Sequence, residues 1–177
     1  DLITTATLAF DTDHRLIGYG LDTVANMGAY NSQFGQAIQT DLFSMVLMGT
    51  YDVQAAYMRT RGVFTNTTPV DAYRGAGRPE AMFVLERSMD AAARQLGVDA
   101  WDLRRRNFIR PDQFPYTTAT DVTYDVGDFA HVLTKAEENS DRARFTARKA
   151  ASAPDWAARS AAALPDPAKA ASRFFPL

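Results

Sequence analysis

Two arginines and two glycines lie close together in residues 71–80 of this chain. The segment reads Asp-Ala-Tyr-Arg-Gly-Ala-Gly-Arg-Pro-Glu, with the arginines at positions 74 and 78 and the glycines at positions 75 and 77. Guanidinium groups are forked, charged donors that suit oxygen-rich acceptors, and glycine lets a backbone come close to a ligand. The composition of this segment therefore predicts a loop that binds an acceptor-rich group. From the segment alone, a tight strand-to-helix turn with solvated or paired arginines remains an alternative.

The residues after this loop predict a long helix whose first turn faces it. Pro79 suits a first helical turn, where an N–H group is not needed. Apolar residues then recur at spacings of three and four up to Gly97, the expected stop: Met82, Leu85, Met89, Ala92 and Leu96. Free N–H groups at the start of such a helix favour an anion. We interpret Glu80 as a residue that complements the helix dipole rather than as a catalytic base.

The residues before the loop predict mainly strands. Residues 2–10 alternate in polarity and, after a polar turn at 11–14, residues 15–27 predict a second strand, so the two should form a hairpin. Residues 37–50 are apolar without alternation and predict a helix, and residues 55–66 return to β character and lead into the loop.

The second half of the chain predicts shorter elements. Asp99 can cap a helix that runs to Asn107, residues 110–128 contain two prolines and predict an ordered loop, and a helix near 128–138 follows. The expected fold class is α+β, with a mostly antiparallel sheet and packed helices.

Composition and charge exclude several classes of function. The net charge of −2 gives no general attraction to nucleic acid, and the run Arg104–Arg106 lies near Asp99 and Asp102, which favours a solvated helix face. The chain has no cysteine, which excludes thiolate metal ligands, and only two histidines, His14 and His131, so a metal site built from histidines is not expected. No apolar stretch reaches the roughly 20 residues that a membrane-spanning helix needs.

The composition changes near residue 140, which predicts two regions. Residues 1–140 are expected to form a partial domain. Residues 141–177 are rich in alanine and predict a poorly ordered tail or one produced by an altered reading frame. Because the chain does not begin with methionine, we expect it to be a fragment.

The residues of the loop resemble the active-site loop of the molybdenum hydroxylases, the family of xanthine dehydrogenase and aldehyde oxidase. The resemblance is greatest to the large chain of the aerobic carbon monoxide dehydrogenase group, in the form with Gly-Ala-Gly in this loop. It extends from residue 1 to about 138. Four further segments match in order and spacing: Asn26–Tyr30, Arg61–Asn66, Leu103–Phe108 and Tyr124–Phe129.

This resemblance implies a set of cofactors and partners. The full subunit would belong to the molybdopterin-binding region of an oxidoreductase and hold molybdenum on molybdopterin cytosine dinucleotide. Partner subunits would carry FAD and [2Fe–2S] clusters, and water would supply the oxygen atom. The implied location is the cytoplasm, with attachment to the inner face of the membrane as an alternative.

The resemblance also implies roles for individual loop residues. Arg74 would lie beside the oxo or sulfido ligands of the metal and is the expected catalytic residue. Tyr73, Gly75, Ala76, Gly77 and Arg78 would bind the cofactor. Copper-containing relatives have a cysteine at the position of Gly75, so a copper bridge is not expected here. Xanthine-type relatives have an aromatic ring at the position of Ala76, so that clamp on a flat substrate is also absent.

Two functions follow as expectations. In the first, the chain is part of a molybdenum hydroxylase that oxidises an aldehyde, a heteroaromatic carbon or carbon monoxide. The family's catalytic glutamate lies downstream of the matching region, so the isolated chain is expected to be inactive. In the second, the chain is a catalytically incomplete, truncated polypeptide that acts only as a structural or assembly piece.

Overall fold

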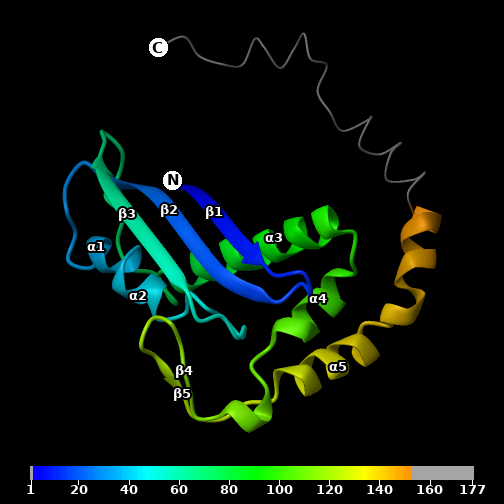
Figure 1. Ribbon diagram of the computed structural model, residues 1–177. Coiled ribbons are helices and arrows are strands. Elements are labelled where there is room, and N and C mark those ends of the chain that lie inside the picture. Colours follow the sequence, from blue (N-terminus) through cyan, green and yellow to red (C-terminus); the bar gives the residue numbers. More distant parts are fainter. Residues whose placement is uncertain (1, 153–177) are drawn as a thin grey trace. The chain divides into compact units, whose positions relative to one another are not determined.

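A three-stranded sheet forms the centre of the fold in this computed structural model, which describes residues 2–152. Strand β1 (Leu2–Phe10) pairs antiparallel with β2 (Leu16–Gly28), and β2 pairs in parallel with β3 (Ala56–Phe64). The order β1-β2-β3 places the longest strand in the middle (Figure 1). The predicted hairpin is confirmed, whereas the parallel pairing of β3 was not visible in the alternation of polarity.

The turn between β1 and β2 is held by Asp11. Its Oδ1 accepts hydrogen bonds from the N–H groups of Asp13 and Arg15 at 2.9 and 2.8 Å, a common way for aspartate to close a turn.

One face of the sheet is covered. Alternate residues of β2 on that face are buried, with Tyr19, Leu21 and Ala25 each at most 2% exposed.

The covered face of the sheet packs against helix α3 (Arg78–Leu96), which Figure 1 shows running along the sheet. The predicted start and end are confirmed, because Pro79 lies in the first turn and Gly97 ends the helix in a left-handed conformation with φ 69°. The buried stripe differs slightly from the expected one. Its fully buried members are Ala81, Leu85, Met89 and Ala93.

The prediction of one helix over residues 37–50 is wrong. Two short helices occur instead, α1 (Gly35–Ile38) and α2 (Asp41–Ser44), followed by turns. Thr40 interrupts them with φ −119° and ψ −91°, outside the helical region. The apolar side chains of this segment are nevertheless buried, with Phe43, Leu47 and Met48 at most 2% exposed. Burial rather than helical periodicity therefore explains its composition.

Helix α4 (Ala100–Asn107) begins as predicted. The side chain of Asp99 accepts hydrogen bonds from the N–H groups of Trp101 and Asp102, which satisfies free donors of the first turn.

The predicted loop 110–128 contains small elements. These are a 3-10 turn (Pro111–Gln113) and an antiparallel pair formed by β4 (Tyr116–Thr117) and β5 (Thr123–Tyr124). Helix α5 (Phe129–Asn139) follows at the predicted place, with the side chain of Asp128 accepting the N–H of His131.

The chain divides into two compact units, one up to His131 and one from Val132 onward. In the second unit, a 3-10 turn (Arg142–Arg144) precedes a helical segment at residues 145–152. The predicted tail 141–177 therefore lies only partly within the described residues, and its portion from 153 onward lies outside them. No helix between residues 2 and 152 is long and apolar enough to cross a membrane.

Candidate functional site

The loop between β3 and α3 folds as consecutive tight turns. Ala76 donates its N–H to the carbonyl of Tyr73 at 3.0 Å, and Arg78 donates its N–H to the carbonyl of Gly75 at 2.9 Å. Both turns need a left-handed residue, which Gly75 and Gly77 supply with φ of 80° and 81°. The Gly-Ala-Gly sequence therefore produces the abrupt entry into α3.

Gly77 packs the loop against the end of α1 and against α2. It is buried, and a Cβ atom at this position would lie 2.3 Å from the carbonyl oxygen of Ile38 and 3.0 Å from the amide nitrogen of Phe43. Such distances leave no room for a side chain. Gly75 differs, because its nearest neighbour would be Pro79 at 3.8 Å. Gly77 is thus needed for packing, whereas at Gly75 a Cβ atom would fit in ordinary contact with Pro79.

Asn26 positions the start of the loop. Its Oδ1 accepts hydrogen bonds from the N–H of Gly28 at 2.8 Å and from the hydroxyl of Thr65 at 2.7 Å, and its Nδ2 donates to the hydroxyl of Thr67 at 3.0 Å. Backbone pairs reinforce this contact, including Thr65 N–H to the Gly28 carbonyl at 2.9 Å. The end of β2 therefore holds the chain that leads from β3 to the loop. Sequence reasoning singled out these matching segments but missed that Asn26 joins them.

Arg74 lies exposed on this loop, and it makes no hydrogen bond or ion pair with any residue between 2 and 152. Tyr73 beside it is 88% exposed. Arg78 is partly engaged, since its guanidinium is 3.4 Å from the carbonyl of Ala76 and 4.0 Å from the sulfur of Met45. Of the two loop arginines, Arg74 is therefore the one whose donors are fully available.

The backbone of the loop also presents unused donors. Within the described part of the chain, no hydrogen bond is formed by the N–H groups of Arg74, Gly75 and Gly77, and no side chain caps the start of α3. Glycine turns that expose successive N–H groups, and helix N-termini, favour anions. Together with the Arg74 guanidinium, these donors fit a group rich in oxygen and nitrogen acceptors.

The predicted site residues thus occupy one short loop. Tyr73, Arg74 and Gly75 are exposed, Ala76 is half-buried and Gly77 is buried. Among residues 2–152, no group of three or more histidine, aspartate or glutamate side chains is arranged to hold a metal ion. The loop offers donors rather than metal ligands, which suits a metal held by an organic cofactor.

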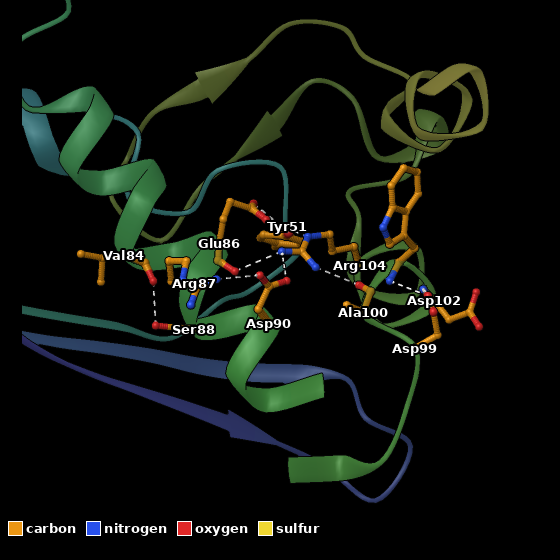
Figure 2. A network of polar contacts seen from close by, with 11 residues as sticks. Tyr51, Val84, Glu86, Arg87, Ser88, Asp90, Asp99, Ala100, Asp102 and Arg104 are labelled. Carbon is orange, nitrogen blue, oxygen red and sulfur yellow. Dashed lines mark hydrogen bonds and ion pairs between the residues drawn. The ribbon is translucent and has the colours of Figure 1, made fainter. Parts of the chain in front are cut away.

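Arg104 is the residue that sequence reasoning misplaced. The expected solvated face is wrong for this residue, because its side chain is only 15% exposed. It donates from Nε to Glu86 at 2.7 Å and from Nη2 to Asp90 at 2.9 Å, while the hydroxyl of Tyr51 donates to the same Glu86 at 2.9 Å (Figure 2). This network joins α4 to α3, so its role is structural. The sequence feature that could have indicated this pairing is the presence of two acidic residues, Glu86 and Asp90, eighteen and fourteen positions before Arg104.

Asn107 has a similar structural role. It is 2% exposed, its Oδ1 accepts the N–H of Leu16 at 2.7 Å, and its Nδ2 donates to the carbonyls of His14 and Leu103. It therefore attaches the end of α4 to the β1–β2 turn. Arg104 and Asn107, both in the matching segment Leu103–Phe108, therefore hold the fold together.

This α+β domain presents free hydrogen-bond donors at the start of α3, as a site for an acceptor-rich cofactor would, and comparison with known proteins identifies the class of cofactor. The sequence model of the family described as "Molybdopterin cofactor-binding domain" matches residues 1–108. The chain therefore belongs to the molybdopterin cofactor-binding domain family, and the resemblance inferred from the sequence is confirmed.

Named relatives and solved structures agree with this assignment. The chain is 35% identical over 147 residues to the carbon monoxide dehydrogenase large chain of Hydrogenophaga pseudoflava. The aligned region covers 81% of this chain and 18% of the relative. It is 31% identical over 144 residues to the nicotine 6-hydroxylase large subunit of Paenarthrobacter nicotinovorans, covering 80% of this chain and 17% of the relative.

The structure of quinoline 2-oxidoreductase from Pseudomonas putida 86 matches with a TM-score of 0.79 and 31% identity, over 87% of this chain and 20% of that one. The described fold is thus that of the molybdopterin-binding region of molybdenum hydroxylases. The chain spans about a fifth of the length of these relatives, which fits the expected fragment.

Proposed function

We propose that this chain is part of the large subunit of a molybdenum hydroxylase and that its loop at residues 73–78 holds the acceptor-rich face of a molybdopterin cofactor. The observation that carries the proposal is the free guanidinium of Arg74 beside the unused N–H groups of Gly75 and Gly77. When bound, the molybdenum–pterin group supplies the redox and oxygen-transfer chemistry, with water as the oxygen source. We propose the cytosine dinucleotide form of the cofactor, as the family resemblance implies.

Each loop residue has a distinct part in this proposal. Arg74 donates forked, charge-assisted hydrogen bonds and stabilises negative charge on the bound group. The N–H groups of Gly75 and Gly77 orient that group, while Gly77 and Asn26 keep the loop in place. Arg78 braces the turn through the Ala76 carbonyl.

The proposed substrate is a small aldehyde, a heteroaromatic carbon or, as the least favoured choice, carbon monoxide. Relatives named as nicotine 6-hydroxylase and quinoline 2-oxidoreductase support a heteroaromatic substrate. With glycine at 75 and no cysteine in the chain, a thiolate bridge to copper has no ligand here. Electrons would leave to partner subunits that carry [2Fe–2S] clusters and FAD.

The test is Arg74→Ala in the complete, cofactor-loaded subunit that contains this sequence. Turnover is expected to fall by about 10²- to 10³-fold, the usual effect of removing a donor to developing negative charge. Thermal stability should not change, because the Arg74 side chain is exposed and forms no hydrogen bond or ion pair with a described residue. Steady-state kinetics with molybdenum quantified by mass spectrometry would separate lost turnover from lost cofactor.

Arg94→Ala is the matched control, since Arg94 is an exposed arginine on the last turn of α3. This variant should retain full turnover and molybdenum content. Equal turnover in wild type and Arg74→Ala would remove Arg74 from the site. Stoichiometric molybdenum and pterin on the isolated 177-residue chain would show that it holds the cofactor without the rest of the subunit.

A further inference from the structure

A groove lies between the first turns of α3 and the beginning of β1. Its volume is about 530 Å3. Two of its apolar side chains, Leu2 and Phe83, are 37% and 67% exposed. The groove is lined by Leu2, Thr4, Pro79, Glu80, Phe83 and Val84. Its walls are therefore mainly apolar and open to solvent, with a single carboxylate among them.

That carboxylate belongs to Glu80 and lacks a partner. Its Oε2 is buried and accepts no hydrogen bond, and neither oxygen forms an ion pair with a residue in the range 2–152. The neighbouring arginines do not pair with it, because Arg78 donates to the Ala76 carbonyl and Arg74 forms no ion pair with any residue that the structure describes. A buried carboxylate oxygen without a hydrogen-bond donor is costly, and buried polar groups in native proteins are normally hydrogen-bonded.

We propose that this groove docks a polypeptide partner through an arginine that lies next to a bulky apolar side chain. The apolar side chain would cover Leu2 and Phe83, and the guanidinium would pair with Glu80. Arginine fits better than lysine because its guanidinium is less strongly hydrated and gives charge-assisted hydrogen bonds to a carboxylate. The inference rests on the groove and its charge, so it is independent of the proposed cofactor chemistry.

The experiment compares two capped tripeptides that differ only in charge. Acetyl-Leu-Arg-Leu-amide is titrated into the ¹⁵N-labelled 177-residue chain, and acetyl-Leu-citrulline-Leu-amide, which is isosteric and neutral, serves as the reference ligand. The arginine peptide is expected to bind about tenfold more tightly, as one charge-assisted pair provides. Amide shifts should concentrate at Leu2, Thr4, Phe83 and Val84. Equal affinities, shifts elsewhere on the chain, or no binding would overturn the proposal.

Variants separate the charge from the apolar walls. Glu80→Gln should remove the preference for arginine over citrulline, whereas Glu138→Gln, at an exposed glutamate of α5, should keep it. Phe83→Ala, which replaces a side chain that is mostly exposed, should keep the fold and weaken both peptides. A preference that survives in Glu80→Gln would contradict the pairing. Self-association of the chain that Phe83→Ala abolishes would assign the groove to a second copy and overturn the proposal.

Discussion

Gly75 and Gly77 have the same backbone conformation and very different surroundings, so they should respond differently to the same substitution. Gly77→Ala would place a Cβ atom 2.3 Å from the Ile38 carbonyl oxygen, and we expect it to lower the free energy of unfolding by about 3 kcal/mol or more. Gly75→Ala meets no atom closer than 3.8 Å, so only the left-handed conformation is disfavoured, by about 1 kcal/mol. Urea unfolding of both variants measures this difference.

Equal destabilisation by the two substitutions would show that the loop is not anchored through Gly77. A third variant, Gly97→Ala, provides the reference for backbone conformation alone. Gly97 has φ 69° and no atom within 4 Å of a Cβ position, so this variant should resemble Gly75→Ala.

Individual residues were predictable where their chemistry is local. The loop with its arginines and glycines was recognised because its residue types are unusual together. The partners of Arg104 were not recognised, because Glu86 and Asp90 lie on another helix. Pairing of residues so far apart in the sequence depends on how α3 packs on α4. Residue type alone does not distinguish a solvated arginine from one that joins two helices.

At the scale of elements, the junction of α3 and α4 depends on Arg104. Arg104→Ala leaves the Glu86 carboxylate without its guanidinium and Asp90 with only the exposed Arg87, and we expect a loss of about 3 kcal/mol in the free energy of unfolding. Chemical denaturation with two spectroscopic probes measures it. The control is Arg87→Ala on α3, where the arginine is 61% exposed and 3.4 Å from Asp90, and it should cost less than about 0.5 kcal/mol. Similar losses in both variants would contradict a special role for Arg104.

The hydrogen bonds of Asp52 should make the free energy of unfolding depend on pH. Although burial acts in the opposite direction, hydrogen bonds from Gln113, Tyr116 and Gln54 hold the pKa of Asp52 below its ordinary value. A carboxyl group with a lowered pKa stabilises the folded chain above its unfolded pKa of about 3.9, and this contribution is lost as the pH falls through the folded value.

Asp52→Asn should therefore be less stable than wild type at pH 7, and the difference should shrink as the pH falls toward 2. Urea midpoints at a series of pH values measure this, with Asp13→Asn in the exposed hairpin turn as the control. A difference that stays constant down to pH 2 would exclude ionisation of Asp52 as the cause.

Elements were predictable where a periodic pattern and end signals agree. The helix after Pro79 has both, and its bounds were confirmed to within a residue. Residues 37–50 have only apolar composition, and they fold as two short helices and turns because the core, rather than a regular stripe, dictates their path. The parallel pairing of β3 with β2 could not be predicted, since it depends on the connection of 27 residues between positions 29 and 55.

At the scale of the whole molecule, the face of the sheet opposite α3 carries apolar side chains with no covering layer among the described residues. Ile3 is 74% exposed, Tyr57 58% and Val63 41%. We expect this face to cause self-association, since exposed apolar patches generally do. Ile3→Lys combined with Val63→Lys should raise the monomer fraction at high concentration, as light scattering after gel filtration would measure.

The matched control places the same substitutions on polar positions of that face, as Thr5→Lys combined with Thr7→Lys. Both pairs add the same charge, so an equal effect would assign the change to charge repulsion rather than to the loss of apolar contacts.

The residues that anchor the loop, Gly77 and Asn26, are different from the residues that the loop exposes. Its path is fixed by backbone contacts of Gly77 and by the hydrogen bonds of Asn26, and neither depends on the side chains at positions 73–76. The side chains at positions 73, 74 and 76 can therefore change without loss of these anchors, whereas position 75 still requires a residue that tolerates the left-handed conformation. Under the proposed function, substitution at Ala76 would alter what the site accepts while the scaffold stays constant, so one rigid frame could serve different substrates during evolution.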